Sequence, residues 1–357
     1  MVNIDYLKRI NPFLPKTFVL YRNFFLLVSN TFFFIISLIL FLASFWNLFI
    51  PHNKIKEKEQ IFIITKNQTI NGIADNLIDL NIINSRDKFI KWTIRWKLDR
   101  NIKTGKYKFY KNSALFDVIS KITNAKMYFE KITIYEGLDL DQTADILESI
   151  GINKKKFKSL CYDKPFIKQF NITANSLEGY LFPDTYNITY GEDEENIIKM
   201  MVNRFFQIIE SLHLENSVIY KTSGLKSGLI IASIIEKESK YLPERKKISS
   251  VFWNRMKSNW RLDSDVTVRY ILKNWANELT KKDLNHDSPY NTRKVYGLPP
   301  GPICNPGKSS IEAAFFPEKT NHMFFICTND DEGRSIFTNT LKEHNKVKNE
   351  LKSRGKL

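Results

Sequence analysis

The chain has 357 residues, which is enough for two or three domains. Its formal net charge of +16 at pH 7 suits an acidic partner, such as anionic lipid headgroups or a carboxylate-bearing cell-wall polymer, and the alternative is that lysine only fills solvated positions. No nucleic-acid-binding motif accompanies the charge, so nucleic acid is excluded as a partner. The three cysteines are widely spaced and the five histidines are scattered, so neither a metal site nor a structural disulfide is expected.

The N-terminal part of the sequence predicts a single membrane span. The apolar core at 24–50 exceeds the roughly 20 residues that a spanning helix requires. It is also longer than the apolar region of a signal peptide, about 7–15 residues, and lacks a small-x-small cleavage site. Four basic residues precede it against one acid. We therefore expect a cytoplasmic tail at 1–22, a transmembrane helix at 23–50, and an extracytoplasmic remainder anchored in the plasma membrane.

Residues 55–128 predict a small α/β module that follows a short polar linker. Two segments have the β-branched, aromatic or alternating pattern of strands, at 61–64 and 103–109. Three segments have the apolar recurrence of helices, at 69–77, 86–95 and 115–122.

Residues 129–357 predict a mixed α+β domain. It opens with a strand at 132–135, a turn at Glu136-Gly137 and a helix at 140–150. Ser309 and Glu312 are spaced as a capping box that opens a later helix. Further elements are expected as an amphipathic helix at 244–257, strands at 323–327 and 335–337, and a charged helix at 340–351.

The segment from Glu178 to Tyr186 gathers aromatic residues around a proline turn. Aromatic rings stack on the apolar faces of sugars, and Glu178 and Asp184 are suited to accept hydroxyl hydrogen bonds. The alternative is a well-packed corner of the domain. Both interpretations stay open on sequence alone.

Glu236 follows the apolar run 229–235, which is long enough for a helix that Ser223 or Ser227 caps. Aliphatic surroundings disfavour the ionised form of a carboxyl group, and a general acid needs that condition near neutral pH. The alternative is a solvated charge at a helix end, paired with Lys240.

Six motifs follow one another along the chain, at 178–186, 232–238, 251–256, 264–265, 288–292 and 297–301. No single motif suffices, but in this order they resemble those of the endolytic murein transglycosylase family, and the resemblance covers essentially all of the chain after Gln60. The resemblance implies a single-pass membrane protein of the α+β class, with a LysM-like subdomain at 55–128 and a catalytic domain at 129–357.

The resemblance also implies an activity. The enzyme would cleave the bond between N-acetylmuramic acid and N-acetylglucosamine in nascent peptidoglycan strands, leave 1,6-anhydro ends and so terminate elongation beside a cell-wall synthase complex. The family's catalytic glutamate falls on Glu236, which would act as acid and then as base without any cofactor.

Five further residues match the family's motif positions and are expected to bind substrate, with bracing of loops as the alternative: Asn254, Asp265, Thr267, Tyr290 and Asn291. The chain departs from the family at Asp263, where Gln is more frequent, and at Val266, where Pro is usual. These departures affect one wall of the site and not Glu236.

Two other functions compete with this interpretation. A non-catalytic, membrane-anchored glycan-binding scaffold would keep the LysM-like module and lack a working acid. A hydrolytic muramidase would need a second carboxylate facing Glu236, and Asp263 or Asp265 is positioned in sequence to supply it. A serine hydrolase is excluded because no Gly-x-Ser-x-Gly motif is present.

Overall fold

The computed structural model describes residues 16–49, 59–125, 127–239, 241–328 and 333–355. Most of the expected cytoplasmic tail, most of the linker after the membrane span, and Lys240 lie outside the described residues. The chain is mixed α+β, as predicted, and helices predominate. It divides into two compact units, Met1–Phe129 and Glu130–Leu357.

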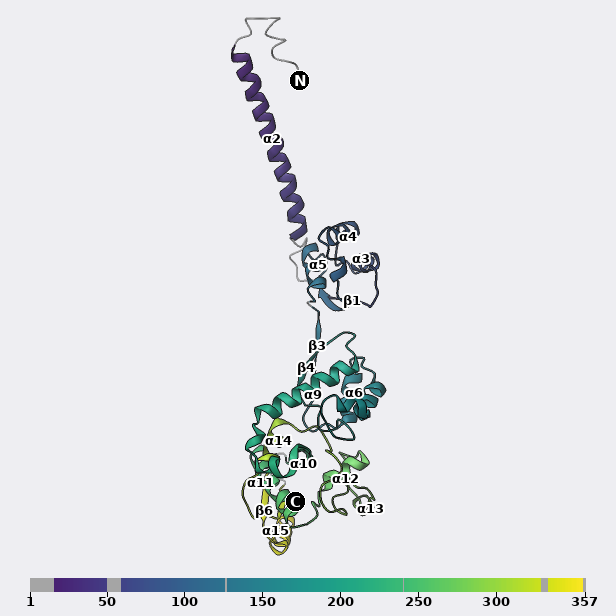
Figure 1. Cartoon of the computed structure of the whole chain (residues 1–357), viewed down its shortest axis with the longest axis vertical. Helices are drawn as coiled ribbons and strands as arrows, with labels where there is room; N and C mark the ends of the chain where they lie inside the picture. Colours follow the sequence, from purple (N-terminus) through teal and green to yellow (C-terminus); the bar gives the residue numbers. More distant parts are fainter. Residues whose placement is uncertain (1–15, 50–58, 126, 240, 329–332, 356–357) are drawn as a thin grey trace. The chain divides into compact units, whose positions relative to one another are not determined.

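The N-terminal helix α2 (Lys16–Phe49) is a candidate membrane anchor or signal sequence (Figure 1). Its segment Phe24–Leu42 has a mean hydropathy of 2.5, and no part of that segment is buried in the protein. At about 1.5 Å per residue a helix of this length reaches across a membrane. Helix α10 (Val218–Glu238) is also long and apolar, but half of it is buried, so it is the core helix of its unit.

Each predicted strand and helix of the first unit is present. Strands β1 (Gln60–Ile64) and β2 (Gly105–Phe109) pair antiparallel, with Gln60 opposite Phe109. Helices α3 (Ile70–Asp79), α4 (Arg86–Arg95) and α5 (Leu115–Thr123) supply the rest, with a short 3-10 turn η1 at Asp99–Asn101. The core contains Phe62, Leu77, Phe89, Tyr107, Phe109, Val118 and Ile122. A two-stranded sheet is stable here because the three helices cover it.

The second unit begins with strands and helices from well-separated parts of the sequence. Strand β3 (Phe129–Thr133) pairs with β4 (Thr185–Thr189), and the hydroxyls of Thr133 and Thr185 are 2.9 Å apart. The helices that follow β3 and β4 are α6 (Leu140–Glu148), α7 (Lys154–Tyr162), α8 (Lys164–Lys168), α9 (Glu194–Ser211) and the 3-10 turn η2 (Leu214–Asn216).

The remaining elements surround α10. They are η3 (Leu242–Glu244), α11 (Arg245–Lys257), α12 (Asp265–Leu272), α13 (Lys281–Leu284), α14 (Lys308–Phe315), β5 (Phe324–Cys327), β6 (Ser335–Thr338) and α15 (Leu341–Ser353). Strands β5 and β6 pair antiparallel, with Phe324 opposite Thr338. Helix α10 packs most extensively on α14, and this packing determines where the end of α10 lies.

Two predicted helix starts are wrong. Helix α10 is capped by Ser217, which accepts the N–H of Tyr220, and Gly224 at φ 74° interrupts the helix, so neither Ser223 nor Ser227 caps it. Helix α14 is capped by Gly307, and the side chain of Glu312 pairs with Lys246 at 2.7 Å instead of closing a capping box. The hydroxyl that caps α10 therefore lies further upstream than predicted, and α14 begins without a side-chain cap.

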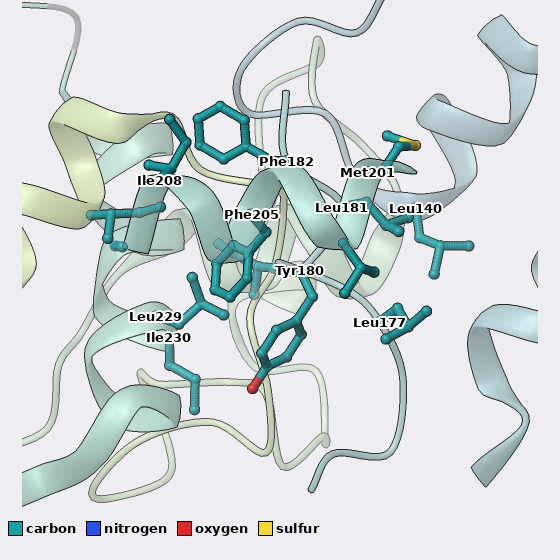
Figure 2. Close-up of a cluster of buried hydrophobic side chains, with 14 of the residues drawn as sticks. Leu140, Leu177, Tyr180, Leu181, Phe182, Met201, Phe205, Ile208, Leu229 and Ile230 are labelled. Atoms are coloured by element: carbon teal, nitrogen blue, oxygen red, sulfur yellow. The ribbon is translucent and has the colours of Figure 1, made fainter. Parts of the chain in front are cut away.

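The aromatic segment 178–186 is a packed corner and not an exposed sugar-stacking surface. Tyr180, Leu181 and Phe182 are buried, and Figure 2 shows them among side chains of α9 and α10. The ring of Tyr180 meets that of Phe205 edge to face at 5.3 Å. Because this corner packs on α10, it holds the core helix in place.

Candidate active site

Glu236 lies in the last turn of α10, and its side chain is only 6% exposed. The guanidinium of Arg245 at the start of α11 donates to both carboxylate oxygens, from Nη2 to Oε1 at 2.8 Å and from Nη1 to Oε2 at 3.3 Å. The N–H of Gly307 donates to Oε2 at 2.9 Å. The predicted partner Lys240 is outside the described residues. Glu236 is therefore a buried carboxylate held by three hydrogen bonds, and not a solvated charge at a helix end.

These donors change the expected electrostatics of Glu236. The apolar run supplies burial, and Arg245 and Gly307 supply hydrogen bonds to both oxygens of the carboxyl group. Sequence reasoning found the burial and missed the donors. The hydrogen bonds from Arg245 and Gly307 also fix the carboxyl group in one orientation. A fixed orientation suits a group that must act on one particular bond of a substrate.

The same face of α10 holds the loop that carries Gly307. Ser233, one turn before Glu236, accepts the N–H of Ile303 at 3.0 Å, and its backbone oxygen accepts the Cys304 thiol at 3.3 Å. The loop from Ile303 to Gly307 thus runs along α10 toward Glu236. This is why an N–H from the start of α14 reaches a carboxylate at the end of α10.

A second carboxyl group, that of Glu136, lies beside Glu236. A Cβ atom placed on Gly307 would be 2.0 Å from Glu136 Oε1 and 2.6 Å from Oε2, so Glu136 occupies the space over that glycine. A Cβ on Gly137 would lie 3.4 Å from Glu236 Cγ. The strand-to-helix turn Glu136-Gly137 therefore contacts both Gly307 and the catalytic candidate.

The carboxyl group of Glu136 has a raised pKa, in part because Glu236 lies beside it. Burial raises its pKa, the charge of Glu236 raises it further, and the Arg245 guanidinium partly offsets both. The Glu136 carboxylate has no hydrogen-bond or ion-pair partner among the residues that the structure describes. Sequence reasoning missed Glu136, and the only signal was an acidic residue before a glycine in a turn.

Asn305 fixes this turn and loop. Its side chain is fully buried, and its Oδ1 accepts the N–H groups of Gly179 and Leu181 at 2.9 and 3.2 Å. Its backbone oxygen accepts the N–H of Gly137, and its N–H donates to Leu138. The turn at Glu136 and the segment at 178–186 are thus joined to the loop that ends at Gly307.

A buried polar cluster contains Glu178. One oxygen of Glu178 accepts the Leu140 N–H at 3.1 Å and the Tyr270 hydroxyl at 3.3 Å. The other oxygen is buried without a partner among the described residues. Burial raises the pKa of Glu178 to about 8, so the group is mostly protonated at neutral pH. Tyr290 belongs to the same cluster, because its ring packs on that of Tyr270 at 5.2 Å.

Asp263 and Asp265 share one ion-pair partner, Arg293. The guanidinium of Arg293 is 2.6 Å from Asp265 and 3.6 Å from Asp263. Asp263 has φ 51°, a left-handed conformation that aspartate tolerates better than most residues. Val266, the second departure from the family pattern, is buried in the core. The carboxylate found beside Glu236 is that of Glu136, whereas Asp263 and Asp265 form an ion-pair group with Arg293.

Three of the other expected substrate contacts have side chains engaged within the protein. The Thr267 hydroxyl donates to the Ser264 carbonyl at 2.8 Å and lies 3.0 Å from the Thr292 hydroxyl. The side-chain amides donate to backbone carbonyls at 2.8–3.0 Å, that of Asn291 to Leu284 and His286 and that of Asn254 to Thr320 and His322. Thr267 and Asn291 are fully buried. These bonds hold loops in place.

Asn254 also lines a cavity of about 620 Å³. The cavity involves Ser217 and Val218 at the start of α10, with Trp253, Phe315 and the chain after α14. Glu236 is in the last turn of the same helix and does not line the cavity. Among the described residues, no group of three or more His, Cys, Asp or Glu side chains could hold a metal ion. No disulfide joins the cysteines of the described residues, Cys161, Cys304 and Cys327.

Comparison with known proteins agrees with this architecture. The model of the YceG-like family matches residues 62–350. A Bacillus subtilis (strain 168) protein named endolytic murein transglycosylase is 36% identical over 305 residues, which is 80% of this chain and 82% of that protein. A protein of the same name from Streptococcus pneumoniae (serotype 2, strain D39) is 26% identical over 284 residues, and this chain spans about half of its length, 51%.

One solved structure extends the comparison to three dimensions. The crystal structure of a putative yceG-like protein from Listeria monocytogenes superposes with a TM-score of 0.56 at 34% sequence identity. The match covers 82% of this chain and all of the Listeria chain. The similarity therefore extends to the fold.

Proposed function

The chain belongs to the YceG-like family, and we propose that it is an endolytic murein transglycosylase, a lyase that acts on peptidoglycan. It cleaves the bond between N-acetylmuramic acid and N-acetylglucosamine within a glycan strand and leaves a 1,6-anhydro end. The observation that carries the proposal is the buried Glu236 carboxylate, fixed by Arg245 and Gly307 in a chain 36% identical to a protein of that name.

Glu236 serves as both acid and base in the proposed reaction. It protonates the oxygen that leaves with N-acetylglucosamine as the bond to muramic acid C1 breaks. The 6-hydroxyl of the same muramic acid then attacks C1, and Glu236 takes the hydroxyl proton, so the enzyme ends with the protonation state it began with. Hydrolytic glycosidases use two carboxyl groups because water is the acceptor, whereas an internal hydroxyl needs no second nucleophile.

Two of the expected substrate contacts keep that role in our proposal. Asp265 is half exposed beside its ion pair with Arg293, and Tyr290 is partly exposed with its hydroxyl facing Gly301, so we assign to both a contact with a polar group of the sugar. Asn254, Thr267 and Asn291 act instead by holding the loops around the site, because their donors are already used.

The first unit anchors and guides the substrate in this proposal. Residues 55–128 form a LysM-like subdomain that binds glycan, and residues 129–357 form the catalytic domain. Helix α2 spans the plasma membrane with the N-terminus in the cytoplasm, since basic residues precede it. The active site then works outside the cytoplasm, close to the membrane, where a cell-wall synthase complex releases new strands.

The test is identification of the strand ends. The full chain in detergent micelles is incubated with uncrosslinked glycan strands, and the new ends are identified by mass. The wild type should give 1,6-anhydro ends, and Glu236→Gln should lose about 100-fold or more of the rate, since acid–base catalysis contributes about that much. Glu312→Gln, which changes an exposed carboxylate of α14, is the matched control and should retain the wild-type rate.

The competing functions predict different results. If the wild type released reducing ends, the reaction would be hydrolysis and not lytic cleavage. The nearby Glu136 carboxyl is the feature that would favour hydrolysis. No cleavage by the wild type, with retained binding of strands, would leave a glycan-binding scaffold. Cleavage that survives Glu236→Gln unchanged would remove Glu236 from the mechanism.

A further inference from the structure

The cavity beside the start of α10 has no part in the proposed reaction. Its volume of about 620 Å³ falls within the range of small-molecule pockets, about 300–1,000 Å³. Three segments form its walls: residues 216–219 around the start of α10, residues between 250 and 257 of α11, and residues 315–321 from the end of α14 onward. Pockets of this size bind ligands through apolar walls and a few fixed polar groups, so the side chains that line this cavity indicate what it can bind.

Fixed apolar side chains form one part of the wall. Trp253 and Phe315 are 5% and 1% exposed. The indole N–H of Trp253 donates to the Ala314 carbonyl at 2.8 Å, so the ring keeps one orientation. Val218 also lines the cavity and is 71% exposed, although it is apolar. A ligand in the cavity would cover this apolar surface, and that burial favours binding.

Asn254 adds a fixed hydrogen-bond acceptor. Its Nδ2 donates to the carbonyls of Thr320 and His322 at 2.9 and 3.0 Å, and the two bonds together fix the plane of the amide. Its Oδ1 accepts no hydrogen bond from the described residues. A ligand with an N–H group can donate to this oxygen, and a peptide backbone supplies such groups.

The charged groups of the cavity favour an anion. Lys257, Glu318 and Lys319 line it, so its walls carry one more positive than negative charge. All three are exposed, and none forms an ion pair with a described residue. Lys246, on the same helix as Lys257, is by contrast paired with Glu312 at 2.7 Å. The two lysines of the cavity are therefore available to a carboxylate.

We propose that this cavity binds a peptide stem of the peptidoglycan substrate. A backbone N–H of the stem donates to Asn254 Oδ1, and a carboxylate of the stem pairs with Lys257 and Lys319. The inference rests on the proposed function, because the stem belongs to the polymer that the enzyme cleaves. A stem is favoured over an acidic segment of a partner protein, because it is attached to a strand that the active site already holds, which raises its effective concentration at the cavity.

The cavity and the active site lie at opposite ends of α10. Val218 and Glu236 are 18 positions apart in that helix, which at about 1.5 Å per residue corresponds to roughly 25 Å. The stem and the reacting bond therefore do not compete for the same space. The cavity holds a stem on a sugar away from the bond that is cleaved, so it changes the binding of the strand and not the chemical step.

The experiment compares strands with and without peptide stems. The full chain in detergent micelles cleaves uncrosslinked strands that carry stems, and the same strands after an amidase has removed the stems. In the double variant Lys257→Gln with Lys319→Gln, KM for the stem-bearing strands should rise about fivefold, since two exposed ion pairs together contribute about that much. We expect kcat, and KM for the stem-free strands, to stay unchanged.

Val218→Asp disturbs the cavity in a different way. Val218 is the first residue of α10, where an acidic side chain is favourable for the helix, so this variant should fold. Its carboxylate repels the carboxylate of the stem, so KM for stem-bearing strands should rise again. The matched control, Lys342→Gln with Lys346→Gln, removes two exposed lysines of α15 that do not line the cavity, and it should leave both KM values unchanged.

Three outcomes would overturn the inference. The first is an unchanged KM for stem-bearing strands in both cavity variants, which is expected if the cavity binds a partner protein instead. The second is an equal rise of KM for both kinds of strand, which would place the sugar chain in the cavity. The third is the same rise in the α15 control, which would reflect net charge alone. If the wild type released no ends, the proposed function would fail, and cosedimentation of the same variants with both kinds of strand would still test the cavity.

Discussion

The side-chain oxygen of Asn305 accepts the backbone N–H of Gly179 at 2.9 Å, across 126 residues of sequence, and that of Leu181 at 3.2 Å. Removal of the amide in Asn305→Ala would leave two buried N–H groups without an acceptor, and each costs about 1–3 kcal/mol. We expect the free energy of unfolding of this unit to fall by about 2–5 kcal/mol. Hydrogen exchange of amides in α10, read by mass spectrometry, measures it.

Asn339→Ala provides the control for this prediction. Asn339 is exposed and contacts His322, so its loss should change stability by less than about 0.5 kcal/mol. If Asn305→Ala changed stability as little as Asn339→Ala, the two N–H groups would have found other acceptors, and the loop would not depend on Asn305.

The second prediction concerns the ion pair of Arg245 with Glu236. Both side chains are only 6% exposed, so the pair is buried. Arg245→Ala leaves a buried carboxylate without its cation, which costs about 3–5 kcal/mol. Arg245→Lys keeps the charge but loses the two-pronged geometry, so it should cost less while still lowering kcat. Stability is again followed by hydrogen exchange, and kcat by the release of strand ends.

The matched control is Arg204→Ala. Arg204 pairs with Asp184 at 2.6 Å, but the two side chains are 41% and 35% exposed, so solvent screens the pair and its loss should cost less than about 1 kcal/mol. Equal costs at Arg245 and Arg204 would show that Glu236 is solvated in solution.

Local sequence patterns predicted most of the elements. The helix at Arg86–Arg95 has the predicted bounds, because Ser85 caps it and apolar residues recur along one face. Helix α9, which is 18 residues long and capped by Asp193, was not among the predicted elements. Its buried Met201 and Phe205 show the recurrence that would have found it.

The candidate site was only partly predictable. Glu236 stands out because a carboxylate follows a long apolar run, which is a local pattern. Its partners Glu136 and Gly307 are 100 and 71 residues away in sequence, and no periodicity joins them to it. Long-range contacts of this kind come from the packing of the 178–186 corner and α10, which a single sequence does not display.

Glu178 makes stability depend on pH. Its folded-state pKa is about 8 against a usual 4.5, so between these values the folded protein binds more protons than the unfolded chain. Stability therefore falls as pH rises from about 5 to about 8, at up to about 1.4 kcal/mol per pH unit from this group. Glu178→Gln cannot ionise, so its stability relative to wild type should improve with rising pH.

The measurement is the unfolding free energy of wild type and Glu178→Gln at pH 5, 6.5 and 8. The difference between the two proteins isolates Glu178 from Glu136 and Glu238, whose pKa values burial also raises. A difference that stayed constant across this range would mean that Glu178 does not change its ionisation there.

Gly228 sets how closely α10 and α14 approach. A Cβ at this position would lie 2.2 Å from Cζ of Phe315, whose ring is buried and packs edge to face on Tyr220. Alanine favours a helix over glycine by about 0.5–1 kcal/mol, but the overlap with a buried ring costs about 1–3 kcal/mol. Gly228→Ala should therefore destabilise the second unit, and Phe315→Leu in the same chain should recover part of the loss.

Gly72 in α3 separates the two contributions. A Cβ there would meet no atom closer than 3.5 Å. Gly72→Ala therefore gains the higher helix propensity of alanine without a steric overlap, and it should stabilise the first unit. Thermal unfolding monitored by hydrogen exchange in each unit tests both changes together. Because the two substitutions are chemically identical, opposite signs can come only from the packing around each glycine, and a stabilising Gly228→Ala would mean that α14 moves freely against α10.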